Sequence, residues 1–330
     1  MICKELPVPL MLILTEIMKY RLIPGHFKHA EIERDLAKRW AGFWGEITLA
    51  TYVKELPQDK YLIFHDIQLQ LNGIHFQIDT LLISKSYILI LEAKNIIGTL
   101  FFDNLFKQLI RKNEDGSEEA FEDPRVQCQR LQSLLKRWMI KNGLNLLPID
   151  YLVFFKSVNT ILKTTPGEIA DFSRVCKARD IFNKIEVMEN RYTHEWIDNQ
   201  ALNSMSKILL SQHSQKQINI LEKYALMQKD IRSGVRCPEC LNIAMNYKRG
   251  KWRCPICKIS CKDAHIESLN DYFYLYKPFI SNSEFRHFLH ISSNDIAQKI
   301  LLSLKLPSTG TTKDRKYHLH PKGDSLCVLP

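Results

Sequence analysis

The sequence lacks a hydrophobic run long enough to span a membrane. The apolar run at residues 7–14 has only eight residues, and Glu16 interrupts the stretch that follows it. A membrane-spanning helix needs about 20 apolar residues in succession. No small-residue cleavage site follows the run, so we do not expect a signal peptide. These absences predict a cytoplasmic protein without a membrane partner.

The sequence also lacks the cysteine pattern of a disulfide scaffold, although it contains nine cysteines in 330 residues. Four of them form two Cys-Pro-x-Cys pairs, which indicates metal binding in a reducing compartment. The pairs are separated by thirteen residues, a spacing typical of a zinc ribbon. Four thiolates close the tetrahedral shell of Zn²⁺, so we predict a structural zinc held by Cys237, Cys240, Cys254 and Cys257.

Two other zinc arrangements are not expected. His194-Glu195 does not begin an HExxH metalloprotease motif, because position 198 is aspartate. Cys261 and His265 lie just beyond the second cysteine pair, and we do not expect either to bind the metal. The alternative to a zinc ribbon is a set of four unrelated cysteines.

The charge of the chain suggests a polyanionic partner. The formal net charge is +10 and the sequence pI is about 9.1, although many basic proteins bind no nucleic acid. Basic residues with an interleaved aromatic side chain cluster between the two cysteine pairs, and this combination suits contacts with phosphates and bases. The alternative is a solvated basic hairpin. The candidate residues are Lys248, Arg249, Lys251, Trp252 and Arg253.

Residues 73–98 carry the candidate catalytic pattern. Asp79 leads into one short apolar run, and Glu92-Ala93-Lys94 ends the next, so the stretch predicts two strands joined by a turn. Alternate residues of a strand share a face, so Glu92 and Lys94 lie side by side, and a hairpin can bring Asp79 beside Glu92. Two converging carboxylates suit Mg²⁺ or Mn²⁺. The alternative is an ordinary surface ion pair.

Two predicted helices add candidates. Residues 30–53 have an apolar stripe at helical spacing, and Glu46 follows Gly45 within this segment. Asp123-Pro124 has the composition of a helix start, and Gln127 and Arg130 fall on the turns that follow. Each of these polar residues has a simple alternative role on a solvated helix face.

Taken together, these residues resemble the PD-(D/E)xK nuclease superfamily, and within it the nuclease-related domain known as NERD. The resemblance covers roughly residues 30–160. Its motifs in this chain are Ala41-Gly42-Phe43-Trp44-Gly45-Glu46, Phe76-Gln77-Ile78-Asp79, Ile90-Leu91-Glu92-Ala93-Lys94-Asn95, Gly98 and Asp123-Pro124-x-x-Gln127.

The resemblance implies a restriction-endonuclease-like α/β fold, in which helices flank a mixed central sheet. It also implies a Mg²⁺-dependent nuclease that hydrolyses phosphodiesters, with DNA favoured over RNA. Glu46, Asp79 and Glu92 would hold Mg²⁺ or Mn²⁺, and Lys94 would position the attacking water. Gln127 would orient the site, while Arg130 would contact a phosphate. The alternative is a nuclease fold that binds nucleic acid without cutting it, or that acts as a regulator.

The remaining segments complete the predicted organisation. Residues 283–304 suggest two helices around a turn, followed by a basic strand, so the end of the chain resembles a winged-helix module; ordinary helical hairpins have the same pattern. We also expect residues 10–20 to form a helix packed on the nuclease domain. The predicted segments are an N-terminal helical extension (1–29), the nuclease-like domain (30–160), a helical support and linker (161–231), the zinc ribbon (232–265) and a helix-turn-helix-like module (266–330). The sequence predicts no oligomeric state.

Overall fold

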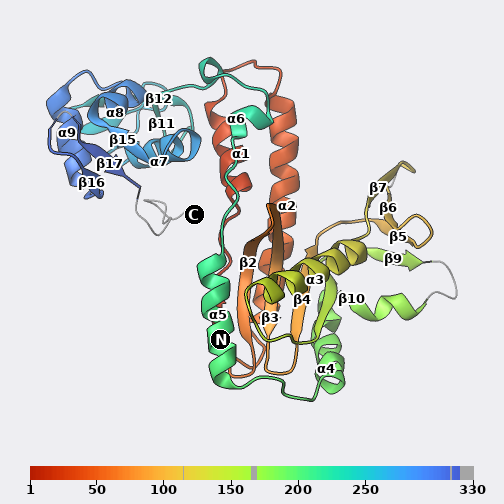
Figure 1. The fold of residues 1–330 in the computed structure, drawn as a ribbon. Coiled ribbons are helices and arrows are strands. Elements are labelled where there is room, and N and C mark those ends of the chain that lie inside the picture. The colour runs from red at the N-terminus through yellow and green to blue at the C-terminus, as the bar shows by residue number, and fades with distance from the viewer. Residues whose placement is uncertain (114, 165–168, 313, 320–330) are drawn as a thin grey trace. The chain divides into compact units, whose positions relative to one another are not determined.

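A computed structural model describes residues 1–113, 115–164, 169–312 and 314–319 (Figure 1). The chain divides into two compact units. Unit 1 comprises Met1–Pro9 and Lys38–Gln217, and unit 2 comprises Leu10–Ala37 and Ile218–Pro330. Helix α2 (His29–Val53) begins in unit 2 and ends in unit 1.

Unit 1 is built on a mixed six-stranded sheet. Strands β2, β3 and β4 form an antiparallel meander, whereas β1 pairs parallel with β2, and β8 and β10 continue the sheet parallel to β4. The strand order is β1-β2-β3-β4-β8-β10. The strands are β1 (Ile2–Lys4), β2 (Leu62–Leu71), β3 (Ile74–Ile83), β4 (Ile88–Lys94), β8 (Ile149–Phe155) and β10 (Val175–Lys177).

The hairpin between β2 and β3 fixes the register of this sheet. Asn72 and Gly73 both have positive φ, 49° and 81°, as the turn of a tight two-residue hairpin requires. Asn72-Gly73 is therefore the turn of a two-residue β-hairpin. The resulting register places Leu71 opposite Ile74 and His65 opposite Thr80.

The central strands are apolar on both sides, so each face of the sheet is covered by helices. Leu81 and Ile90 belong to one hydrophobic core, and their neighbours Leu82 and Leu91 belong to another. Helices α3 and α5 contribute to the first core, whereas α2 and α4 contribute to the second. Besides α2, the described helices of unit 1 are α3 (Pro124–Lys141), α4 (Ile181–Arg191), α5 (Asn199–Gln212), and the short 3₁₀ helices at Ile169–Arg174 and Ala178–Asp180.

A second sheet of unit 1 follows β4 in the chain. Strand β5 pairs antiparallel with β6 and parallel with β9, and β6 pairs antiparallel with β7. A turn at residues 104–107 separates β5 from β6. The strands are β5 (Thr99–Asp103), β6 (Gln108–Lys112), β7 (Glu118–Glu122) and β9 (Ile161–Thr164).

Unit 2 joins the cysteine-containing segment and the C-terminal helices in one hydrophobic core. A small curled antiparallel sheet carries the four cysteines in its loops. A second sheet, of strand order β15-β17-β16, is formed by strands that precede and follow helices α8 and α9 in the chain. Its elements are β11 (Val235–Arg236), β12 (Ile243–Lys248), β13 (Lys251–Arg253), β14 (Ser260–Cys261), α7 (His265–Leu275), β15 (Phe279–Ser281), α8 (Asn282–Leu289), α9 (Asn294–Ser303), β16 (Ser308–Thr309) and β17 (Lys316–His318).

The N-terminal helix belongs to unit 2, so the expectation that it packs on the nuclease domain is wrong. Helix α1 (Leu10–Arg21) contacts α6 (Ile220–Lys223) and α7. Met18 of α1 shares a buried cluster with Tyr224. Helix α6 is a single turn of four residues. Across the described ranges, no helix combines the length and apolar character needed to cross a membrane.

A buried ion pair connects the N-terminal helix with α7. Arg21 is fully buried, and its Nε lies 2.6 Å from Oδ2 of Asp271. Its Nη1 also donates hydrogen bonds to the carbonyl oxygens of Arg232 and Gly234. Removing one member of a buried pair leaves the other charge uncompensated, which costs about 3–5 kcal/mol.

We predict that Asp271→Ala destabilises unit 2 by about 3–5 kcal/mol. Hydrogen exchange of peptides from residues 218–312 measures the change. The control is Lys28→Met, because Lys28 and Glu31 form a more exposed pair in the same unit, worth about 1 kcal/mol or less. Equal protection in the two variants would contradict the prediction.

Candidate active site and metal centre

The end of β4 places a carboxylate and an ammonium in direct contact. Glu92 is only 3% exposed, and the Lys94 Nζ donates a hydrogen bond of 2.6 Å to its Oε1. Gln127 of α3 closes the arrangement. Its Nε2 donates to the same Glu92 oxygen at 2.8 Å, and its Oε1 accepts from Lys94 Nζ at 3.0 Å. The structure therefore brings Glu92, Lys94 and Gln127 together.

The start of α3 explains how Gln127 reaches this point. Asp123 precedes the helix, and its Oδ1 accepts a hydrogen bond from the Arg125 backbone N–H at 2.8 Å, while Pro124 is the first helical residue. An acidic N-cap followed by proline fixes the helix start. Gln127 then lies on the first turn, where its side chain extends to β4.

Asp79 lies beside this group on the neighbouring strand. Thr80 is paired with Leu91, so Asp79 and Glu92 are the next residues of β3 and β4. Asp79 Oδ2 accepts a hydrogen bond of 3.0 Å from the Ala93 backbone N–H. Burial raises the pKa of Asp79 well above its usual range, and the negative charges of Glu92 and Glu46 raise it further.

Glu46 lies on α2, next to Gly45, where this helix comes close to the end of β4. A Cβ at Gly45 would lie 3.2 Å from the Cβ of Asn95, so glycine permits this approach. Burial raises the pKa of Glu46 to about 7, with Asp66 and Glu92 adding to the rise and Lys94 opposing it. The Oε2 atom of Glu46 is buried without a hydrogen-bond partner.

The charge of Lys94 is stabilised in the same place. Burial acts to lower the pKa of Lys94, but the adjacent carboxylates of Glu92 and Asp79 outweigh it, and the net effect is a raised pKa. Lys94 therefore remains an ammonium at neutral pH. It can orient or donate to an oxygen atom, but it cannot accept a proton.

The carboxylates fit a divalent cation in charge, although they do not form a closed cage. Among the described residues, only the four cysteines form a group of three or more metal-ligating side chains whose ligand atoms all lie within 4.8 Å of one another. The oxygens of Glu46, Asp79 and Glu92 therefore do not all converge within that distance. The unpartnered Glu46 oxygen and the raised pKa values of Glu46 and Asp79 nevertheless fit a place where a divalent cation would bind.

Asp66 is a neighbour of this site that the sequence interpretation missed. It lies on β2 between His65 and Ile67, which pair with Thr80 and Ile78, so it is opposite Asp79. Its φ of 49° departs from strand geometry. Its Oδ2 lies 3.6 Å from Lys4 Nζ. Asp66 and Asp79 are the same number of residues from the Asn-Gly turn, and this equal spacing could have identified Asp66 as a neighbour of Asp79 from the sequence.

The basic residues predicted to contact nucleic acid are exposed in the structure. Arg130 is exposed on α3 and stays a prediction. In the β12–β13 hairpin Lys248 is opposite Lys251, and Arg249 and Arg253 are also exposed. These four cations likewise remain predictions.

Trp252 is not available for stacking on a base, so this part of the prediction is wrong. The residue is fully buried, and its Nε1 donates a hydrogen bond of 3.1 Å to Nδ1 of His265. Its ring packs against Tyr247 at a centroid distance of 5.2 Å. Trp252 is thus a core residue of the curled sheet.

The four cysteine sulfurs have the spacing of a zinc site. Cys237 Sγ is 3.5 Å from Cys257 Sγ, and Cys240 Sγ is 3.6 Å from Cys254 Sγ. A tetrahedron with zinc–sulfur distances of about 2.3 Å has sulfur–sulfur edges of about 3.8 Å. The cluster therefore fits a structural Zn²⁺ with four thiolate ligands, as the sequence predicted.

Comparison with known families identifies a domain within unit 1. Residues 41–156 match the family described as "NERD: Nuclease-related domain". No curated protein and no solved structure matches the chain. The matched range contains Glu46, Asp79, Glu92, Lys94 and Gln127.

We predict that the metal-free protein loses stability as the pH rises from about 4.5 to about 7. The pKa of Glu46 is about 7 in the folded protein and ordinarily 4.5, so between these values the folded state binds more protons than the unfolded state. Glu46→Gln removes this effect. The variant should be more stable than the wild type at pH 8 and equal to it near pH 4.

Thermal unfolding in metal-ion-free buffer at both pH values measures this difference. Glu33→Gln is the control, because Glu33 is exposed on the same helix. A Glu46→Gln effect of the same size at pH 4 and pH 8 would show that the carboxyl group does not have a raised pKa.

We also predict one zinc ion per chain, lost in Cys254→Ser and retained in Cys261→Ser. Structural zinc contributes on the order of 10 kcal/mol to the folding of small zinc domains. Loss of the ion should therefore expose the β11–β14 sheet to hydrogen exchange. Zinc content by elemental analysis measures occupancy, and full zinc in Cys254→Ser would contradict the ligand assignment.

Proposed function

We propose, from the nuclease-related domain at residues 41–156, that the protein is a Mg²⁺-dependent nuclease that hydrolyses phosphodiester bonds, with DNA as the favoured substrate. The observation that carries the proposal is the buried contact of Glu92 with Lys94 and Gln127, beside Asp79 and Glu46. A structural ion pair alone would not need two further carboxylates with raised pKa values.

Glu46, Asp79 and Glu92 would hold the divalent cation in this proposal. When bound, the ion supplies Lewis-acid stabilisation of charge on a phosphoryl oxygen. Binding also explains why a helix and two strands bring acidic groups together in a partly buried place, since Lys94 offsets only part of their mutual repulsion and a divalent cation would offset the rest. Mn²⁺ would serve in the same role.

Lys94 would act on the attacking water or on the phosphate. Its ammonium is held in place by Glu92 and Gln127, so it offers a fixed donor near the carboxylates. A fixed donor stabilises developing negative charge without reorganisation during the reaction. Gln127 is a positioning residue in this account, because it contacts both partners of the ion pair.

The rest of the molecule supports a nucleic-acid substrate. The meander β2–β4 with parallel β8 and β10, flanked by helices, supports a restriction-endonuclease-like core. The order α7, β15, α8, α9, β16, β17, with β17 in the middle of its sheet, supports a winged-helix-like module. The exposed cations of the β12–β13 hairpin and Arg130 would contact phosphates.

A second candidate function is nucleic-acid binding without hydrolysis, as a platform or a regulator. The spacing of the three carboxylates favours it, because their oxygens do not all lie within 4.8 Å of one another. The two candidates differ in one respect that can be measured, which is cleavage in the presence of a divalent ion.

We predict that the wild-type protein cleaves DNA with Mg²⁺ or Mn²⁺, and that Asp79→Asn and Lys94→Ala each lower the rate at least about 100-fold. The first variant would lose a cation ligand and the second the fixed donor. Cleavage of labelled single-stranded and duplex DNA, and of RNA, measures the rates. The control is Lys141→Ala, because Lys141 is exposed and donates to Asn72 at the far end of α3.

The outcomes separate the two functions. Wild-type rates in either site variant would refute the catalytic assignment. Salt-sensitive binding of DNA, with no cleavage under any metal condition, would favour the binding function instead.

A further inference from the structure

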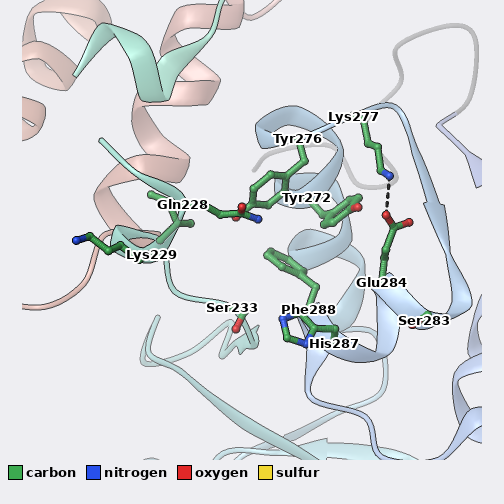
Figure 2. A pocket seen from close by; sticks show the side chains of 11 residues that line it. Gln228, Lys229, Ser233, Tyr272, Tyr276, Lys277, Ser283, Glu284, His287 and Phe288 are labelled. Atoms are coloured by element: carbon green, nitrogen blue, oxygen red, sulfur yellow. Dashed lines mark hydrogen bonds and ion pairs between the residues drawn. The ribbon is translucent and has the colours of Figure 1, made fainter. Parts of the chain in front are cut away.

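Unit 2 contains a pocket that neither the sequence motifs nor the nuclease-related domain explains. Its volume is about 820 Å³, within the range of about 300–1,000 Å³ that is usual for small-molecule sites. The segment at Gln228–Ser233 lines one side, and α7 and α8 line the other (Figure 2). All of the lining residues lie in unit 2.

Three aromatic rings form one wall of the pocket. The ring centroids of Tyr272 and Phe288 are 5.2 Å apart, and those of Tyr272 and Tyr276 are 5.1 Å apart. Tyr272 and Phe288 are largely buried, whereas Tyr276 is half-buried. Tyr276 therefore offers the most accessible ring, and Figure 2 shows the Gln228 side chain extending toward it.

A buried positive charge lies behind this wall. The Arg21 guanidinium carbon is 4.7 Å from the centroid of Phe288. Although Arg21 pairs with Asp271, its Nη2 is buried with no hydrogen-bond partner. The same charge acts against the rise that burial causes in the pKa of Tyr276. The aromatic wall thus has a cation on its buried side.

The pocket's acidic group is neutralised by its own neighbours. Glu284 Oε1 is 2.5 Å from Lys277 Nζ, and its Oε2 accepts hydrogen bonds from the backbone N–H and Oγ of Ser281. These contacts hold the pKa of Glu284 below its usual range, against the opposing effect of burial. Lys229 is exposed on the segment opposite the rings, and Figure 2 shows its ammonium directed away from them, so it offers positive charge beyond the aromatic wall.

We propose that this pocket binds a nucleotide, with the base stacked on Tyr276 and a phosphate next to Lys229. The half-buried ring supplies a flat apolar surface, and base–aromatic stacking is worth about 1–3 kcal/mol per base. Gln228 provides both an amide donor and an acceptor for the polar edge of a base. The nucleotide is either an unpaired residue of a strand or a free mononucleotide, since both have the same chemistry. The proposal extends the function given above and does not depend on hydrolysis.

Fluorescence anisotropy with a labelled ten-nucleotide thymidine oligomer tests the proposal. Asp79→Asn protein without added Mg²⁺ is the parent, so that the probe is not cut. We expect Tyr276→Ala to weaken binding about tenfold and Lys229→Glu to weaken it by a similar factor. Tyr276→Phe should keep the parent affinity, because it retains the ring.

A matched control and two competitors complete the experiment. Lys299→Glu makes the same charge change at an exposed site of α9 outside the pocket lining. Competition by thymidine monophosphate would identify a free nucleotide as the ligand, and competition by unlabelled oligomer alone would identify an unpaired nucleotide of a strand.

Equal affinity of Tyr276→Ala and Lys229→Glu with the parent would overturn the proposal. So would equal losses in Lys229→Glu and Lys299→Glu, because they would indicate only a general charge effect. Absence of cleavage by the wild type would overturn the nuclease function but leave the result for the pocket intact.

Discussion

A carboxylate buried at the end of an apolar strand is the constraint on which unit 1 depends. Glu92 is almost fully buried, so its charge must be compensated locally. Lys94 provides the ammonium from the same face of β4, and Gln127 binds both groups from α3. The helix start at Asp123 and the parallel pairing of β4 with β8 are therefore part of the same arrangement, because they fix the two elements that supply these side chains.

The ammonium of Lys94 does not balance all of the acidic groups around Glu92. Asp79 and Glu46 add two more acidic groups beside Glu92, and both have raised pKa values. Lys94 is the cation in contact with this group, whereas Lys4 pairs with Asp66 on the neighbouring strand. An excess of acidic groups in a half-buried site is unfavourable for the protein alone and favourable for binding a divalent cation. This excess of acidic groups lies within the range that matches the nuclease-related domain.

The local features could be predicted where a short pattern determines the geometry. The Asn72-Gly73 turn fixes the register of β2 and β3, and the two-residue period of β4 places Glu92 beside Lys94. Asp66 was missed although it and Asp79 are equally far from the Asn-Gly turn; its positive φ, by contrast, has no sequence signature. The burial of Trp252 was missed as well, because a three-residue strand does not reveal which of its faces is the core. The partner of α1 was misjudged for a related reason, since an apolar helix face does not specify what covers it.

The proposed binding of a divalent cation by Asp79 and Glu92, with Glu46 nearby, can be tested by anomalous diffraction from crystals of the wild-type protein soaked in Mn²⁺. We expect one strong peak between Asp79 and Glu92, with metal–oxygen distances of about 2.0–2.2 Å. The soak uses a Mn²⁺ concentration at which the protein cleaves DNA in solution. A map without a peak between Asp79 and Glu92 at that concentration would contradict cation binding by these carboxylates.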